Sequence, residues 1–78
     1  MLIGTRFRLR TTTMAIGEAG EKRTAVIIPA GEVVRAISSP TKDRRMVDVL
    51  WNGRAVTLFA VDLEWRGEQL PEAVAAHN

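Results

Sequence analysis

Apolar and polar residues alternate with a period of two along most of this chain, and that alternation constrains its fold more than any other feature. From Ile3 to Thr11, every second residue is Arg or Gly, and the residues between them are Ile, Thr, Phe, Leu and Thr. Because successive side chains of a strand point to opposite faces, the pattern predicts a strand with one buried face and one cationic face. We therefore expect an all-β domain.

Turn residues divide the rest of the chain into short strands. Asn52-Gly53 is the strongest hairpin signal, because both central residues of a type I′ turn need a positive φ. Gly17–Gly20 is expected to form another turn, and Ala60–Asp62 a single 3₁₀ turn. The expected strands after the first are Arg23–Ile28, Glu32–Ile37, Met46–Trp51, Arg54–Phe59 and Leu63–Arg66.

Five to six short antiparallel strands favour a small closed barrel, because closure removes the strand edges that would pair with other chains. We expect residues 1–67 to form this barrel and residues 68–78 a flexible C-terminal tail, with a short helix after Pro71 as the alternative. Val34 and Ala36 are expected to point into the barrel. Trp51 and Trp65 are expected to cap the two ends of its core.

The chain lacks the side chains that most catalytic and metal sites use. It has no cysteine, no tyrosine and one histidine, His77, which argues against disulfides, thiolate or multi-histidine metal sites and cysteine proteases. Ser38 and Ser39 have no histidine partner in the strand region. Asp62 and Glu64 lie two apart on one expected strand, the spacing of a charged face. We expect no catalytic residue, no cofactor and no bound metal.

The sequence also contains none of the usual signals for export or membrane insertion. Its start has no apolar stretch of about 7–15 residues, as a secretory signal would. No run approaches the roughly 18 apolar residues that span a bilayer. We expect a cytoplasmic protein that does not bind membranes.

Basic residues concentrate in the first part of the chain. Residues 1–45 carry nine basic and four acidic groups (+5), and residues 46–78 carry two basic and five acidic ones (−3), which sum to +2. We favour a neutralised face, on which Asp62 and Glu64 form cross-strand ion pairs with the first-strand arginines. The alternative is nucleic-acid binding through Arg6, Arg8, Arg10, Lys42, Arg44 and Arg45.

More large apolar residues are present than the interior of such a small barrel can hold. Val33, Ile37, Leu50 and Phe59 fall on strand faces opposite the expected core. Exposed apolar side chains of this kind mark contacts with a partner or a second copy. We therefore expect a non-catalytic module for protein–protein interaction or self-association. The predicted contact residues are Leu50, Phe59, Val33, Ile37 and Trp65.

Two segments resemble parts of the Src-homology-3-like barrels. Residues 28–34, Ile-Pro-Ala-Gly-Glu-Val-Val, are similar to the start of the second strand of that fold. Residues 58–64, Leu-Phe-Ala-Val-Asp-Leu-Glu, resemble its end, where a 3₁₀ turn leads into the closing strand. The resemblance spans residues 5–66 and implies a barrel of this type. Its peptide-binding members line a groove with aromatic residues that have no counterparts at Met46, Val47 or Asp62, so recognition of proline-rich peptides is not implied.

A remote alternative comes from the type II dihydrofolate reductases, which are tetramers of short Src-homology-3-like barrels. Residues 56–59, Val-Thr-Leu-Phe, are similar in position to their active-site Val-Gln-Ile-Tyr segment. Thr57 stands in place of the amide that this segment needs, and Phe59 lacks the hydroxyl group. The resemblance in fold therefore does not carry over the reductase's functional groups.

Overall fold

A computed structural model describes residues 3–39 and 45–71, which form one antiparallel sheet and one short helix. The strands lie in the order β3-β2-β6-β5-β4-β1-β7. The all-β prediction is confirmed, with seven strands instead of five or six. In chain order the elements are β1 (Arg6–Leu9), β2 (Thr13–Ala19), β3 (Lys22–Ile28), β4 (Val33–Ala36), β5 (Met46–Trp51), β6 (Arg54–Phe59), α1 (Ala60–Arg66) and β7 (Gly67–Gln69).

The hairpin of β5 and β6 forms where the sequence predicts it. Both strands have the predicted bounds, and Asn52 and Gly53 between them have φ values of 51° and 75°. Positive φ at both positions is the condition for a type I′ turn, whose twist matches that of the flanking strands. The hairpin directs alternate residues inward, and these apolar side chains form the centre of the core: Val47, Val49, Val56 and Leu58.

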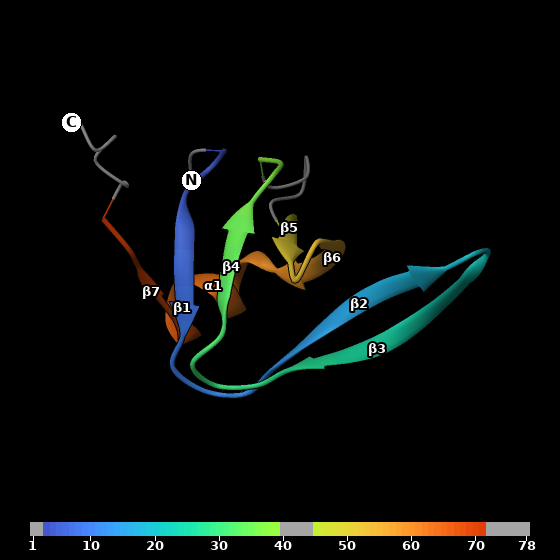
Figure 1. Ribbon diagram of the computed structural model, residues 1–78, viewed down its shortest axis with the longest axis horizontal. Coiled ribbons are helices and arrows are strands. Elements are labelled where there is room, and N and C mark those ends of the chain that lie inside the picture. The colour runs from blue at the N-terminus through green and yellow to red at the C-terminus, as the bar shows by residue number, and fades with distance from the viewer. Residues whose placement is uncertain (1–2, 40–44, 72–78) are drawn as a thin grey trace.

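The core is completed by one face of each neighbouring element. The predicted inward residues Val34 and Ala36 are buried on β4, as are Phe7 and Leu9 on β1. β1 lies between β4 and β7, and α1 carries the chain from β6 to β7 (Figure 1). The result is a small all-β domain compatible with a small β-barrel, but the expected removal of strand edges is wrong: within the described residues β3 and β7 end the strand order and each pairs with one strand. The further members of the core cluster are Ala15, Ile28, Ala60 and Leu63.

The β2–β3 hairpin leaves the body of the domain as an arm. Figure 1 shows it projecting along the longest axis of a chain that measures 44 × 27 × 25 Å. The base of the arm is attached by the pairing of β2 with β6, in which Ile16 lies opposite Thr57. Beyond this point β2 and β3 pair with each other as far as the turn at Gly20–Glu21.

The predicted turn at Gly17–Gly20 begins too early, because Gly17 lies within β2. A Cβ atom at this position would lie 2.8 Å from Val26 Cγ2 and 3.3 Å from an Arg54 guanidinium nitrogen. The glycine thus permits close packing between the strands of the arm and against β6. The turn itself uses Gly20, whose φ is +66°.

The predicted strand over Leu63–Arg66 is wrong, because residues 60–66 form α1 and the closing strand begins at Gly67. The buried residues of α1 are Ala60 and Leu63, which lie on one face at helical spacing. Its first turn carries Asp62 and its last turn Arg66, the arrangement that the helix dipole favours. Part of the expected tail, residues 68–71, is described and begins on β7; residues 72–78, including the alternative helix, lie outside the described residues.

Helix formation also overturns one prediction for the tryptophans. Trp65 is 78% exposed on α1 and does not cap the core. Trp51 is half-buried and packs against the core cluster, as expected. Its indole Nε1–H donates a hydrogen bond to Glu32 Oε1 at 2.9 Å, which fixes the ring between β5 and the turn before β4.

Candidate partner-binding groove

A groove runs between the arm and the outer face of β5 and β6. It consists of two hollows of about 350 and 210 Å³ that share Ile16, Met46 and Thr57 in their walls. We call it the arm groove. The residues that line it are Met14, Ile16, Glu18, Arg23, Met46, Asp48, Thr57, Phe59 and Asp62.

The arm groove exists because β2 presents its large side chains outward. On the buried face of this strand stand small residues, Thr13, Ala15 and Gly17, which let β2 approach the body closely. On the other face stand Met14 and Ile16, together with Glu18 nearer the tip. These side chains form one wall of the groove.

The opposite wall comes from the outer face of the β5–β6 hairpin. In its register Met46 lies opposite Phe59, and Asp48 lies opposite Thr57. Phe59 is 48% exposed and Met14, across the groove, is 59% exposed. The end of the groove near α1 therefore offers a largely apolar surface.

The carboxylates of the groove are held in different ways. Asp48 accepts a hydrogen bond of 2.7 Å from the Thr57 hydroxyl, and its backbone N–H donates to Ser38 Oγ at 3.0 Å. Asp62 is paired with Arg66 at 3.6 Å. Asp48 is thus an oriented carboxylate on the groove wall, with a neutral hydroxyl as its side-chain partner.

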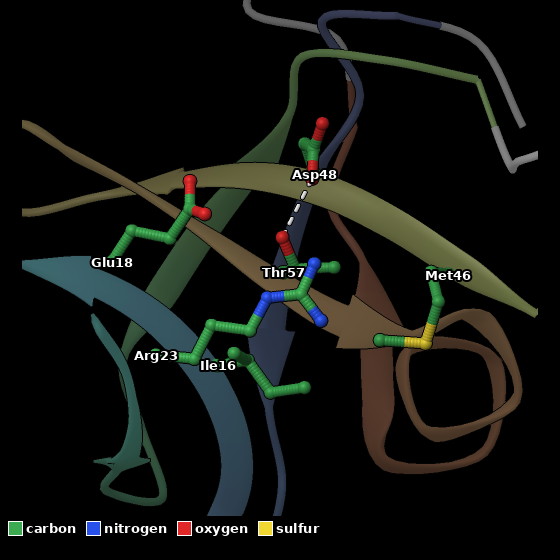
Figure 2. A pocket seen from close by; sticks show the side chains of 6 residues that line it. All are labelled: Ile16, Glu18, Arg23, Met46, Asp48 and Thr57. Atoms are coloured by element: carbon green, nitrogen blue, oxygen red, sulfur yellow. Dashed lines mark hydrogen bonds between the residues drawn. The ribbon is translucent and has the colours of Figure 1, made fainter. Parts of the chain in front are cut away.

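The arm adds two charges of opposite sign. Figure 2 shows Glu18 and Arg23 entering from the arm, and Asp48 and Thr57 from the sheet. Glu18 and Arg23 are direct cross-strand partners on β2 and β3. With Asp48 and Asp62 on the opposite side, carboxylates outnumber cations among the lining residues, so the groove is acidic as well as apolar.

The residues predicted to contact a partner do not form one surface. Phe59 lies in the arm groove. Val33, Ile37 and Leu50 are 38%, 38% and 37% exposed on the outer face of β4 and β5. Trp65 is on the outer side of α1, one helical turn from the exposed Val61.

The first-strand arginines have neighbours that the sequence analysis did not foresee. Arg6 lies directly opposite Arg35, and Arg8 opposite Glu68 of β7. The expected ion pairs of these arginines with Asp62 and Glu64 are wrong, since both acids are on α1 and Asp62 binds Arg66. Arg10 is exposed, as is Arg45, which directly precedes β5. Lys42 and Arg44 lie outside the described residues.

Most of the groove residues escaped the sequence analysis. A signal for them is present in residues 13–18, where small and large residues alternate. Met14 and Ile16 alternate with the small residues Thr13, Ala15 and Gly17. The small residues suit the face of the strand that packs closely against the domain, so the large apolar residues must lie on the other face. Asp48 and Thr57 came together only through the register of the β5–β6 hairpin.

Within residues 3–39 and 45–71, no group of three or more potential ligands is placed to hold a metal ion. In the same residues no helix is long and apolar enough to cross a membrane. No protein-family model, curated protein or solved structure matches the chain. The geometry of the arm groove is therefore the basis for a functional proposal.

Proposed function

We propose that this chain is a non-catalytic protein-binding module of the Src-homology-3-like type, and that the arm groove holds an extended segment of the partner. The strand order supports the barrel type, because β1 lies between β4 and the closing strand β7, and a single helical element separates β6 from β7. The observation that carries the function is the arm groove itself, an open channel with apolar walls and fixed carboxylates.

The side chains of the groove define the chemistry of the segment that would bind. Met14, Met46 and Phe59 offer deformable or flat apolar surface, which favours a large aliphatic or aromatic side chain. Asp48 is oriented by Thr57 and favours an arginine or lysine beside that apolar residue. The proposed ligand is therefore an extended segment in which a basic and a large apolar residue lie close together.

Selection from a phage library of random dodecapeptides tests this proposal. We expect the enriched peptides to combine a basic residue with a large apolar one, and to lose most of their binding to a Phe59→Ser variant. Leu50→Ser is the matched control, because Leu50 is also exposed but lies outside the groove. Asp48→Asn should weaken the same peptides by about fivefold at low salt, the effect of one exposed charge pair.

Two results would contradict the proposal. One is that no peptide is enriched on the folded protein. The other is that the enriched peptides bind Phe59→Ser as well as they bind the unmodified chain. Loss of binding in Leu50→Ser alone would move the contact surface to the outer face of β4 and β5 and would also reject the groove.

Nucleic-acid binding is the second candidate, and one observation favours it. Arg6 and Arg35 are directly opposed across β1 and β4, which places two cationic residues side by side on one sheet face; the Arg6 guanidinium donates to the Pro71 carbonyl at 3.1 Å, and Arg35 is exposed. Fluorescence anisotropy with a labelled DNA duplex tests it. Affinity that falls with salt and is reduced in Arg35→Gln supports the candidate, and no binding at low salt rejects it.

A further inference from the structure

β3 forms an unpaired edge of the sheet. It is the last strand in the order β3-β2-β6-β5-β4-β1-β7, and within the described residues its one strand partner is β2. Its side chains from Lys22 to Ala25 are exposed, and Ile27 is 56% exposed. Such an edge presents a row of free backbone N–H and C=O groups to any strand that can align with it.

The two edges of the sheet differ in how well they are protected. β7, at the other end, has three residues and carries the charged Glu68. β3 has seven residues, and its last five, Thr-Ala-Val-Ile-Ile, contain neither a charge nor a proline. Short length and charged side chains are the usual means of blocking edge-to-edge pairing. β3 lacks these protections over most of its length.

The turn of the arm determines which backbone groups of β3 face outward. Ala19 and Lys22 flank the two-residue turn and so form a hydrogen-bonded pair. Because bonded and non-bonded positions alternate along an antiparallel ladder, Arg23, Ala25 and Ile27 direct their N–H and C=O groups away from β2. Ala25 is the middle residue of β3, which runs from Lys22 to Ile28.

An antiparallel partner centred on Ala25 fits this edge when the partner is another β3. In that register Ala25 faces its own copy and all of β3 is paired. Arg23 faces Ile27 of the other copy, so its aliphatic stem covers an exposed apolar side chain and no like charges are opposed. Ile27 is already beside the exposed Met14 within the arm, so the new pairing would extend one apolar row across both molecules.

We infer that the chain forms a two-fold symmetric dimer in which the β3 strands of two copies pair antiparallel about Ala25. The proposal concerns the edge of the arm and does not depend on what the arm groove binds. We choose a second copy as the partner because this register pairs all of β3 with itself. The outward backbone groups of one copy meet those of the other, and no two like charges are opposed.

A cysteine at the two-fold position gives a direct test in this cysteine-free chain. Hydrogen-bonded antiparallel partners have Cα atoms about 5.5 Å apart, but their Cβ atoms lie at the wide end of about 4.5–5.5 Å, beyond the roughly 3.5–4.5 Å of a disulfide. We therefore expect Ala25→Cys to be cross-linked readily to a covalent dimer by a short bis-maleimide, which bridges the two thiols. The matched control is Ala55→Cys, also exposed and on a strand but separated from the outer edge of β3 by β2, which should cross-link much more slowly.

Light scattering on the unmodified chain supplies the second measurement. We expect a dimer at high protein concentration, and a dissociation constant raised about tenfold or more by Ala25→Lys, which places two ammonium groups at the two-fold axis. A monomer at every concentration, with equal cross-linking of the two cysteine variants, would overturn the inference. So would a dimer that Ala25→Lys leaves unchanged, because that dimer would use another surface.

Discussion

Replacement of Gly67 by alanine should destabilise the domain where α1 meets β7. The φ of Gly67 is −101°, so its backbone conformation suits any residue. The constraint is space: a Cβ atom would lie 2.5 Å from the carbonyl oxygen of Leu63 and 3.3 Å from Phe7 Cβ. That carbonyl also accepts the hydrogen bond from the Gly67 N–H. Because the obstacle is backbone that is already bonded, either α1 or β7 must shift.

The magnitude follows from two opposing effects. Insertion of a methyl group into a packed site costs about 1–3 kcal/mol, and the immobile carbonyl places Gly67 in the upper part of that range. Alanine also lowers the conformational entropy of the unfolded chain, which stabilises the folded state by about 0.4–1 kcal/mol. We expect a net loss of about 2 kcal/mol, which for a domain of this size lowers the melting temperature by about 10 °C.

Thermal and urea unfolding followed by circular dichroism measure this effect. Gly53→Asn is the control, because a Cβ atom at Gly53 meets nothing within 4 Å and asparagine tolerates its φ of +75°. This control should change stability by less than about 1 kcal/mol. A Gly67→Ala variant as stable as the unmodified chain would refute the reasoning, because β7 or α1 would then have moved aside without loss of stability.

Two further predictions concern the tryptophans. Trp51→Phe should lower the free energy of unfolding by about 1–2 kcal/mol, because it removes the hydrogen bond from the half-buried indole to Glu32. Urea unfolding measures this loss, and an unchanged unfolding midpoint would contradict the prediction. Trp65→Ala should change the free energy of unfolding by less than about 0.5 kcal/mol, because Trp65 is 78% exposed. The fluorescence of the remaining Trp51 should have its maximum at a shorter wavelength than that of the unmodified chain. A loss above about 1 kcal/mol would mean that Trp65 packs against the domain.

The sequence was informative wherever local signals agreed with one another. Residues 46–59 combine strict alternation with an Asn-Gly pair, and both the strand bounds and the turn were predicted correctly. The inward positions Val34 and Ala36 were also correct, because the opposite face of the strand carries Arg35, whose charge would be costly to bury.

Local signals failed where two periodicities fit the same residues. Leu63 and Trp65 alternate with charged residues, which reads as a strand. The same segment has Ala60 and Leu63 at helical spacing, and an Asp62–Arg66 pair four residues apart. Packing of α1 against β1, β6 and β7 selects the helix, and part of this contact involves residues distant in sequence.

Local patterns indicate one wall of the arm groove, through the alternation in residues 13–18, but not the groove as a whole or the β3 edge. Each depends on the arm leaving the body of the domain, and that geometry is set by the pairing of β2 with β6. No separate strand was expected between Thr11 and the predicted turn at Gly17–Gly20. The separate hairpin instead places Met14 and Ile16 opposite the β5–β6 sheet.

The two proposed surfaces would act together because of how the arm is built. The outer face of β3 carries Arg23, which lines the arm groove, and the edge of the same strand carries the proposed dimer contact. A two-fold axis between antiparallel strands is perpendicular to the sheet, so both copies would present their grooves on the same side. A partner with two binding segments could then engage both grooves, and the second contact would form at high effective concentration. Dimerisation would thus raise the avidity for repeated or clustered segments.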